Sequence, residues 1–500
     1  MIKKLFYGSF FLLVSVIFVV VLLKPSNNLI PGRMVLYTLI WLAFVCIMRT
    51  LFGVVENWIV KKGWNIDRIS KVGFRVLVCL LAVALYMIST AFRTSPITDY
   101  QQIYNTSLAL AQGQPVENWH YYAMYPYNLG TVSLLVLCMK GGFLLGMEDP
   151  YYFVLAVNVI QVMLVVWAVF YLAGFLKKDS YAFRWTVVFL FLCWTPVWAY
   201  TSAFYSDQLS FGGSIIGMAL FCAGYREKKP RKWIWISMAG IFWALSVFAK
   251  VTAWIPFVAF VIMILLHSKK TSLWREILVF AAILFAISLG LNCFLQQFPS
   301  AEMEEQYGMP AEYEIVIGLL GDGTYGQQIE FVEECLGKES RQDRQEYCRQ
   351  IIKDNWKSFF DMQRMAAKTR VIFGSGEIAP TALAYPYEEN LLWNWFSSDG
   401  AYYWKYCCLS TGYFFSVLFL MILGAFGQLV GKKEENPLVF QSYLAVFGLI
   451  VFLLLWEAQN KQLYNHIPWM TMASGYGLEY LYGIIASRTN YFRTKRVKEE

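Results

Sequence analysis

The chain has 500 residues, of which 58% are hydrophobic, 18% aromatic and only 15% charged. A soluble globular domain carries about 25% charged residues, and repeated apolar runs in this sequence reach the roughly 20 residues that a membrane-spanning helix needs. The composition therefore excludes a soluble protein and predicts an all-α polytopic membrane protein.

The net charge of +8 is distributed unevenly along the chain. The polar segment 299–400 holds 18 of the 34 acidic residues but nine of the 42 basic ones. The remaining lysines and arginines lie mainly in short loops between apolar runs. Such a distribution indicates membrane topology and gives no sign of a nucleic-acid partner.

The first three predicted spans are residues 5–23, 34–51 and 74–92. No small-residue cleavage pattern follows the first run, so we expect an uncleaved span rather than a removed signal peptide. The loop between the second and third spans is basic (Lys61, Lys62, Arg68 and Lys71), and the positive-inside rule places it in the cytoplasm. The third span then leads to the external side.

Residues 93–150 form a predicted external catalytic loop, polar and aromatic in its first part, with six tyrosines between residues 93 and 127. Two apolar runs follow, 128–147 and 151–176. The basic residues in 177–184 and 226–232 are both expected in the cytoplasm, which requires an odd number of crossings. The run 128–147 is the weaker, because Lys140-Gly141-Gly142 interrupts it, so we predict a helix lying in the outer interface.

The other spans are predicted at 151–176, 181–199, 209–224, two within 233–266, and 277–295. Residues 296–402 then form a large, mostly helical external loop domain, which divides the membrane domain 1–295 from the C-terminal part 403–500. That last part contributes spans at 406–430, 438–456 and 467–485 and a basic tail. The total is about twelve spans with both ends in the cytoplasm, as in a multi-pass protein of the plasma (cytoplasmic) membrane.

Asp99 is the candidate catalytic residue, because it follows the end of a span at the start of the external loop. There it could take a proton from an acceptor hydroxyl as a general base. The alternative is a solvated interfacial carboxylate or a helix cap.

Four further charged residues are candidates for substrate binding on the same external side. Asp207 precedes a span, where it could hold a sugar hydroxyl or a divalent cation, or simply cap a helix. Lys250 interrupts an apolar run and could meet a phosphate or extend its ammonium to the interface. Glu457 and Lys461 share a short loop, where they could form an ion pair or, for Lys461, contact a phosphate.

Tyr100, His120 and Tyr125 are candidates to line a sugar pocket, although aromatic belts at the membrane interface explain such residues equally well. No cofactor is indicated with certainty. A divalent metal remains open, with Asp99 and Asp207 as its candidate ligands. Cys335 and Cys348 lie 13 residues apart in the acidic segment and are a candidate disulfide if that segment faces an oxidising exterior.

No Walker loop or dinucleotide-binding glycine motif occurs in a suitable context. An external site also lacks a supply of nucleotide-activated sugars. A donor carried on a lipid would fit such a site.

Several segments resemble the membrane glycosyltransferases of the GT-C superfamily, which includes protein mannosyltransferases and aminoarabinose transferases. The resemblance rests on TDYQQIYNTSLALAQG, YYAMYPYNLG, YSDQ, FAKVTAW and WEAQNKQLYNHIP. In that family the first large external loop carries a catalytic acid, then a Tyr-Pro segment and an interface helix. Asp99 matches the acid by its position in the loop.

The resemblance implies a polyprenyl-phosphate-linked sugar as donor and an extracytoplasmic acceptor, a cell-envelope glycan, lipid or protein. Two features depart from the family pattern. The acid follows the third span here, whereas in the family it follows the first, and Lys461-Gln462 replaces an Arg-Tyr pair. Lysine keeps the charge of arginine but loses its bidentate geometry.

Two other functions remain open. A polymerase or ligase of lipid-linked glycans would draw on arginines of the large loop, such as Arg341, Arg344, Arg364 and Arg370. A transporter or flippase of lipid-linked glycans would carry out no bond transfer and would show paired helix breaks or inverted repeats.

Overall fold

The computed structural model describes residues 2–178, 180–267, 271–295, 298–378, 384–386, 390–431 and 436–499. The predicted start of the external loop domain, residues 296 and 297, lies outside the described residues. The described chain is almost entirely helical, with one two-stranded antiparallel sheet that pairs β1 (Thr94–Pro96) with β2 (Ala384–Pro386).

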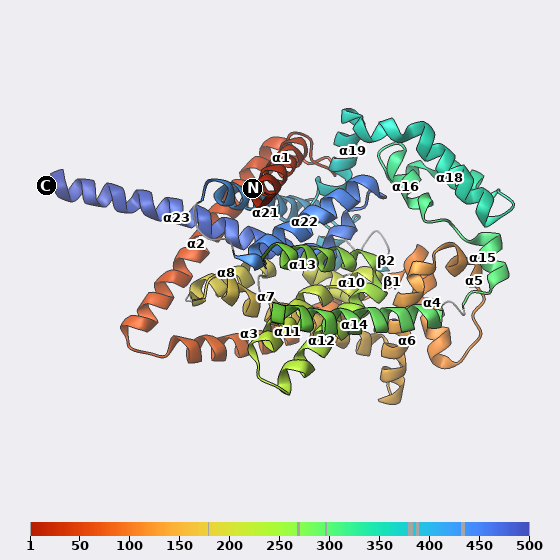
Figure 1. Cartoon of the computed structure of the whole chain (residues 1–500), viewed down its shortest axis with the longest axis horizontal. Coiled ribbons are helices and arrows are strands. Elements are labelled where there is room, and N and C mark those ends of the chain that lie inside the picture. The colour runs from red at the N-terminus through yellow and green to blue at the C-terminus, as the bar shows by residue number, and fades with distance from the viewer. Residues whose placement is uncertain are drawn as a thin grey trace.

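The N-terminal part consists of three long helices, a group of shorter ones and a second set of long helices (Figure 1). The helices up to the polar segment are α1 (Ile2–Leu23), α2 (Pro31–Lys61), α3 (Ile66–Ala91), α4 (Thr98–Gln112), α5 (Trp119–Met124), α6 (Leu129–Leu144), α7 (Tyr151–Leu176), α8 (Tyr181–Leu192), α9 (Thr195–Ala199), α10 (Ser206–Ser210), α11 (Gly213–Arg226), α12 (Arg231–Ala249), α13 (Trp254–His267) and α14 (Thr271–Leu295).

The polar segment is also helical, and the chain then returns to long apolar helices. The polar segment contains α15 (Ala301–Tyr307), α16 (Glu312–Leu319), α17 (Ile329–Leu336), α18 (Arg341–Asn355), α19 (Met362–Phe373) and α20 (Leu391–Phe396). The last helices are α21 (Tyr403–Val430), α22 (Pro437–Leu455) and α23 (Ile467–Glu499), with the 3-10 segment η7 (Asn460–His466) between α22 and α23.

Among the described residues, ten helices are long and apolar enough to cross a membrane, and the bent α8–α9 pair would make an eleventh. Pro196, at the start of α9, has no N–H to continue a helix, and the chain bends there by 65°. Every predicted span corresponds to a helix, although α13 and α23 are not among the ten and α6, predicted to lie in the interface, is. The prediction of an all-α polytopic membrane protein is confirmed.

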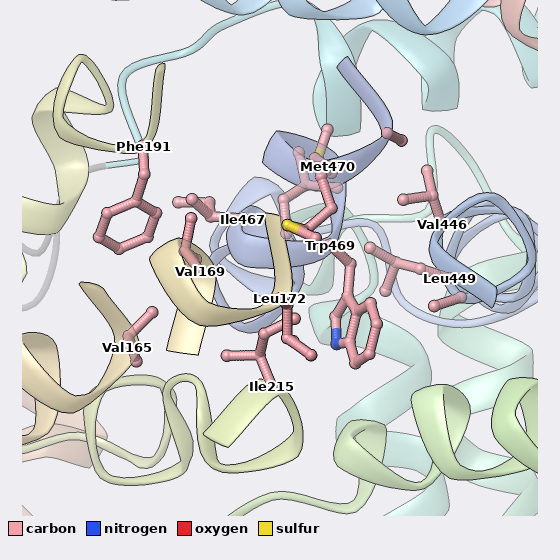
Figure 2. Close-up of a cluster of buried hydrophobic side chains, with 14 of the residues drawn as sticks. Val165, Val169, Leu172, Phe191, Ile215, Val446, Leu449, Ile467, Trp469 and Met470 are labelled. Atoms are coloured by element: carbon pink, nitrogen blue, oxygen red, sulfur yellow. The ribbon is translucent and has the colours of Figure 1, made fainter. Parts of the chain in front are cut away.

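The core of the bundle forms where α7, α8, α11, α22 and α23 meet (Figure 2). Residues from all five helices are fully buried in this cluster: Val165, Val169, Leu172, Phe191, Ile215, Val446, Leu449, Ile467, Trp469 and Met470. Trp469 also has a polar partner, because its indole N–H donates to Ser214 Oγ at 3.0 Å. The buried polar group is therefore satisfied, as burial requires.

The loops predicted to be cytoplasmic gather at one end of the bundle, which we call the basic end. Glu479 of α23 pairs there with Arg49 of α2, at 2.8 Å, and with Lys177 after α7. Asn436, just before α22, donates to the carbonyl of Phe175 at 2.7 Å. The arrangement is consistent with the predicted alternation of the spans.

The two ends of the predicted catalytic loop meet each other at the opposite end of the bundle. Arg93 pairs with Asp149 at 2.7 Å, and its guanidinium also donates to the hydroxyl of Tyr152. The segment between them therefore leaves and returns at the same end. Its first helix, α4, has 15 residues, fewer than the roughly 20 that cross a bilayer. This geometry favours the predicted interfacial position of α6, although α6 is long and apolar enough to span.

The helices α15–α18 form a small unit with an apolar core of its own, contributed by residues such as Tyr313, Val316, Ile317 and Phe331. Arg344 of α18 is fully buried in this unit. Its guanidinium donates to four backbone carbonyls, those of Glu305, Gln306, Gly308 and Lys338. One charged side chain thus satisfies several carbonyls that would otherwise be buried without donors.

A lysine of α19 ties this unit to the loop after α22. Lys368 is fully buried and donates to the carbonyls of Gly318 and Trp456, at 2.6 and 2.5 Å. The absence of a side chain at Gly318 permits the contact, because a Cβ there would lie 2.4 Å from the Trp456 carbonyl oxygen. We call this contact the Lys368 clasp.

Candidate functional site

The five charged residues predicted for the site converge at the end of the bundle opposite the basic end, where Glu314, which was not predicted, joins them. They come from five separate segments: the start of α4, the short helix α10, the break between α12 and α13, α16, and the loop between α22 and α23. The site residues are Asp99, Asp207, Lys250, Glu314, Glu457 and Lys461, and we call them the charged cluster.

Asp207 and Lys250 form an ion pair beneath the rest of this cluster. The Asp207 side chain is fully buried and that of Lys250 is 15% exposed. Lys250 ends α12, so the helix break there turns its ammonium towards Asp207. Asp207 therefore does not act as a helix cap: the N-cap of α10 is Tyr205. The second oxygen of Asp207, Oδ2, has no hydrogen-bond partner among the described residues.

A layer of buried polar groups surrounds the ion pair. Tyr464 donates to Gln208 Oε1 at 2.7 Å, and Asn465 donates to Ser210 Oγ at 2.6 Å. His466 is fully buried, and neither ring nitrogen has a partner among the described residues. Burial and the nearby Lys250 lower the pKa of His466 to about 3, so the imidazole is neutral at physiological pH.

Lys461 is the cation around which the cluster is arranged. Its ammonium lies 4.9 Å from the centre of the Tyr205 ring. Burial alone would lower the pKa of Lys461, but the pKa is raised because ionisable groups surround the ammonium: Tyr205, Asp207, Glu457 and Asp99. The lysine is therefore charged, and it sits within the electrostatic reach of both candidate aspartates.

Two glutamates share the site and affect each other's protonation. Burial first, and then the charge of Glu457, raises the pKa of Glu314 to about 8, so Glu314 carries a proton at neutral pH. Burial also raises the pKa of Glu457, although Lys461 opposes that rise. No salt bridge within 4 Å joins Glu457 to Lys461 in the described chain, and Glu457 instead accepts a hydrogen bond from Gln459.

Asp99 lies in the first turn of α4 at the partly exposed edge of the cluster. It makes no capping hydrogen bond, because the N-cap of α4 is Ile97. The Tyr121 hydroxyl lies near Asp99, and burial first and then the negative charge of Asp99 raise the pKa of Tyr121. Asp99 is thus accessible while remaining within reach of Lys461.

The predicted aromatic residues occupy different places. Tyr100 is buried below the site, where its hydroxyl accepts the N–H of Phe204 at 2.9 Å. His120 is exposed and faces Tyr307 of α15, with the ring centres 5.9 Å apart. Tyr125 packs against the core of the α15–α18 unit. Tyr125 is also near enough to Asp99 for that charge to contribute to the raised pKa of the tyrosine. Tyr100 and His120 thus lie outside the charged cluster, and Tyr125 lies at its edge.

Sequence reasoning missed Glu314, Tyr121, Tyr205 and His466. Tyr205 and His466 lie within segments that the resemblance singled out, YSDQ and WEAQNKQLYNHIP. Glu314 lies in an acidic segment without a motif, and only the packing of α16 against α22 places it in the site.

The donor set does not match a divalent cation. Asp207 is already neutralised by the Lys250 ammonium. Among the described residues, no three His, Cys, Asp or Glu side chains are grouped to hold a metal ion. We therefore derive no step through a metal held by Asp99 and Asp207.

The large-loop candidates are placed as follows. Arg344 and Arg364 bond to backbone carbonyls within the polar segment, and Arg341 is exposed on α18. Cys335 and Cys348 are both buried as free thiols, with their sulfurs 3.9 Å apart. A disulfide requires about 2.05 Å, so their pairing stays a prediction.

Together the helices and their distribution define a polytopic integral membrane protein. A family model described as "conserved hypothetical integral membrane protein" matches residues 1–359, and the chain belongs to this family. No curated protein sequence matches the chain.

Among solved structures, the chain is similar to the archaeal oligosaccharyltransferase AglB from Archaeoglobus fulgidus, in complex with an inhibitory peptide and a dolichol-phosphate. The identity is 14% and the TM-score 0.42. The match covers 85% of this chain and 52% of the archaeal protein, so the chain spans about half the length of that protein.

Proposed function

We propose that the protein is a membrane glycosyltransferase that moves a sugar from a polyprenyl-phosphate donor to an acceptor outside the cytoplasm. The observation that carries the proposal is the charged cluster: one accessible carboxylate, Asp99, lies within electrostatic reach of a partly buried cation, Lys461. This is the pair of charges that such a transfer needs. The proposed location of the site is the external face of the plasma membrane.

In the proposed reaction, Asp99 takes the proton of an acceptor hydroxyl. The acceptor oxygen forms a bond to the anomeric carbon, and the bond from that carbon to the phosphate oxygen breaks. The bonding electron pair leaves with the phosphate, which departs as polyprenyl phosphate. Lys461, supported by Lys250, offsets the charge that develops on the phosphate.

The test is transfer from a labelled polyprenyl-phosphate sugar by purified protein, wild type against Asp99→Asn. Removing a general base costs roughly 10²–10⁴-fold in rate, so we expect a loss of that size in kcat. The matched control is Glu117→Gln, an exposed acid of the same loop, which should keep full activity. Unchanged turnover by the Asp99→Asn variant would remove Asp99 from this role.

The polymerase or ligase alternative has less support. Its chemistry would require arginines of the polar segment to be available for a substrate. Arg344 is fully buried and Arg364 donates to backbone carbonyls, so two of the four candidate arginines are already committed. The same assay distinguishes the two functions, because a polymerase extends a glycan by repeat units and the proposed enzyme adds single sugars.

A further inference from the structure

A cavity of about 480 Å³ lies beside the charged cluster. Four separate parts of the chain line it: the loop after α1, the end of α19 with the residues that follow, the start of α21, and the loop between α22 and α23. Its lining residues are Ser26, Asn27, Val371, Ser375, Glu377, Tyr403, Ala458, Gln459, Asn460 and Lys461. We call it the Glu377 cavity, and its volume is within the roughly 300–1,000 Å³ of small-molecule sites.

The lining is polar but mostly uncharged. Hydroxyl and amide side chains predominate, with one carboxylate, Glu377, and one ammonium, Lys461. Neutral donors and acceptors spread around a cavity suit a ligand with many hydroxyls, since each hydroxyl both donates and accepts. A strongly anionic or an apolar ligand would leave most of these groups without partners.

Glu377 is 7% exposed and is held in place by its neighbours. Its Oε2 accepts from Asn27 Nδ2 at 2.5 Å and from Ser375 Oγ at 3.4 Å, and Cys407 Sγ is 3.8 Å away. Its Oε1 accepts from the Tyr403 hydroxyl. A carboxylate oxygen has two acceptor positions, so Oε1 retains one for a ligand.

Asn27 reaches Glu377 through an unusual backbone conformation. Asn27 and Asn28 both have φ of 55°, in the left-handed region that asparagine tolerates better than most residues. Asn460, in the loop between α22 and α23, makes no hydrogen bond from its side-chain amide to any described residue. The cavity thus has one fixed acceptor and one free amide.

Two residues connect the cavity to the charged cluster. Gln459 lines the cavity and donates to Glu457. Lys461 lines the cavity with part of its side chain while its ammonium lies over the Tyr205 ring. The cavity therefore meets the charged cluster at Lys461, so a ligand in the cavity would place its anionic group there.

We infer that the Glu377 cavity holds the saccharide of the lipid-linked donor, an inference that rests on the proposed function. The saccharide hydroxyls bond to Glu377, Gln459 and Asn460, and the phosphate to which the sugar is attached lies at Lys461. The cavity thereby selects the donor by its sugar, whereas the charged cluster recognises the phosphate that all such donors share.

The test uses the full chain in lipid nanodiscs and measures Kd for farnesyl phosphate and for farnesyl phosphate bearing glucose, mannose, galactose or N-acetylglucosamine. We expect at least one glycosylated lipid to bind wild type about tenfold more tightly than farnesyl phosphate. Asn460→Trp, which fills the cavity, should abolish the higher affinity for the glycosylated lipid and leave the Kd of farnesyl phosphate unchanged. Glu377→Gln, which does not fill the cavity, should reduce the difference between the two Kd values.

The control variant is Gln342→Trp on the exposed surface of α18, which should bind every lipid as wild type does. Equal affinity of wild type for farnesyl phosphate and all four glycosylated forms would overturn the inference, as would a full gain in the Asn460→Trp variant. Failure of wild type to bind any of the lipids, farnesyl phosphate included, would instead overturn the proposed function.

Discussion

The Asp207–Lys250 pair shows what a single buried charge costs. Removing one partner of a buried pair leaves the other uncompensated, at about 3–5 kcal/mol. We expect Asp207→Leu and Lys250→Met each to lower the free energy of unfolding by that amount, and the double variant Asp207→Leu, Lys250→Met to recover most of the loss. Thermal unfolding of the four proteins in one detergent gives the coupling energy. Additive losses would show that the two groups do not stabilise each other.

Glu314 gives the protein a predictable pH dependence. Its pKa is raised to about 8 in the folded protein, above an ordinary value of about 4.5, so between these values the folded state binds more protons than the unfolded state. Stability from this group therefore falls as pH rises from about 4.5 to 8. The Glu314→Gln variant should not lose this stability. Its thermal midpoint should therefore exceed that of wild type by an amount that grows as the pH rises from about 4.5 to 8.

The control for this pH series is Glu333→Gln, an exposed residue of α17. Its midpoint should follow wild type at every pH. A constant offset between Glu314→Gln and wild type from pH 4.5 to 8 would mean that Glu314 does not titrate differently on folding.

At the scale of single elements, α18 is fixed to its neighbours through Arg344. Replacement of Arg344 by Met leaves four backbone carbonyls without this donor, and each hydrogen bond to a charged group contributes about 1.5–3 kcal/mol. We expect Arg344→Met to unfold the α15–α18 unit locally, so limited proteolysis should cut between residues 301 and 355. Arg341→Met, on the exposed side of the same helix, should resist cleavage. Cleavage at the wild-type rate in both variants would contradict this role.

The sequence predicted the positions of the helices better than it predicted the residues of the charged cluster. Apolar runs in the sequence located a helix for every predicted span, because a bilayer leaves helical structure as the way for such segments to satisfy their backbone. The charge of Asp207 and Lys250 in apolar surroundings was enough to mark them as candidates. Glu314 could not be found in this way, since it comes from a short helix of the acidic segment that the Lys368 clasp holds against the loop after α22. The sequence could not distinguish aromatic residues that line a site from those of an interfacial aromatic belt. Tyr100, for example, was predicted to line the pocket but packs below the site.

For the whole molecule, the distribution of loops between the two ends predicts which residues share a compartment. Cysteines introduced at Glu117 and Gln342 should react with a membrane-impermeant maleimide from one side of sealed vesicles, and cysteines at Lys62 and Arg231 from the other; all four positions are exposed. The wild-type chain, labelled in parallel, gives the background of the native cysteines. Labelling of Glu117→Cys and Lys62→Cys from the same side would contradict the topology and with it the external site.

The ion pair of Arg93 with Asp149 makes the intervening segment a self-closing insertion in the membrane bundle. Because its two ends meet, the segment can be replaced, or changed in length, without reversing the direction in which any later helix crosses the bilayer. Under the proposed function, replacement of this one segment would change acceptor preference and leave the later helices as they are.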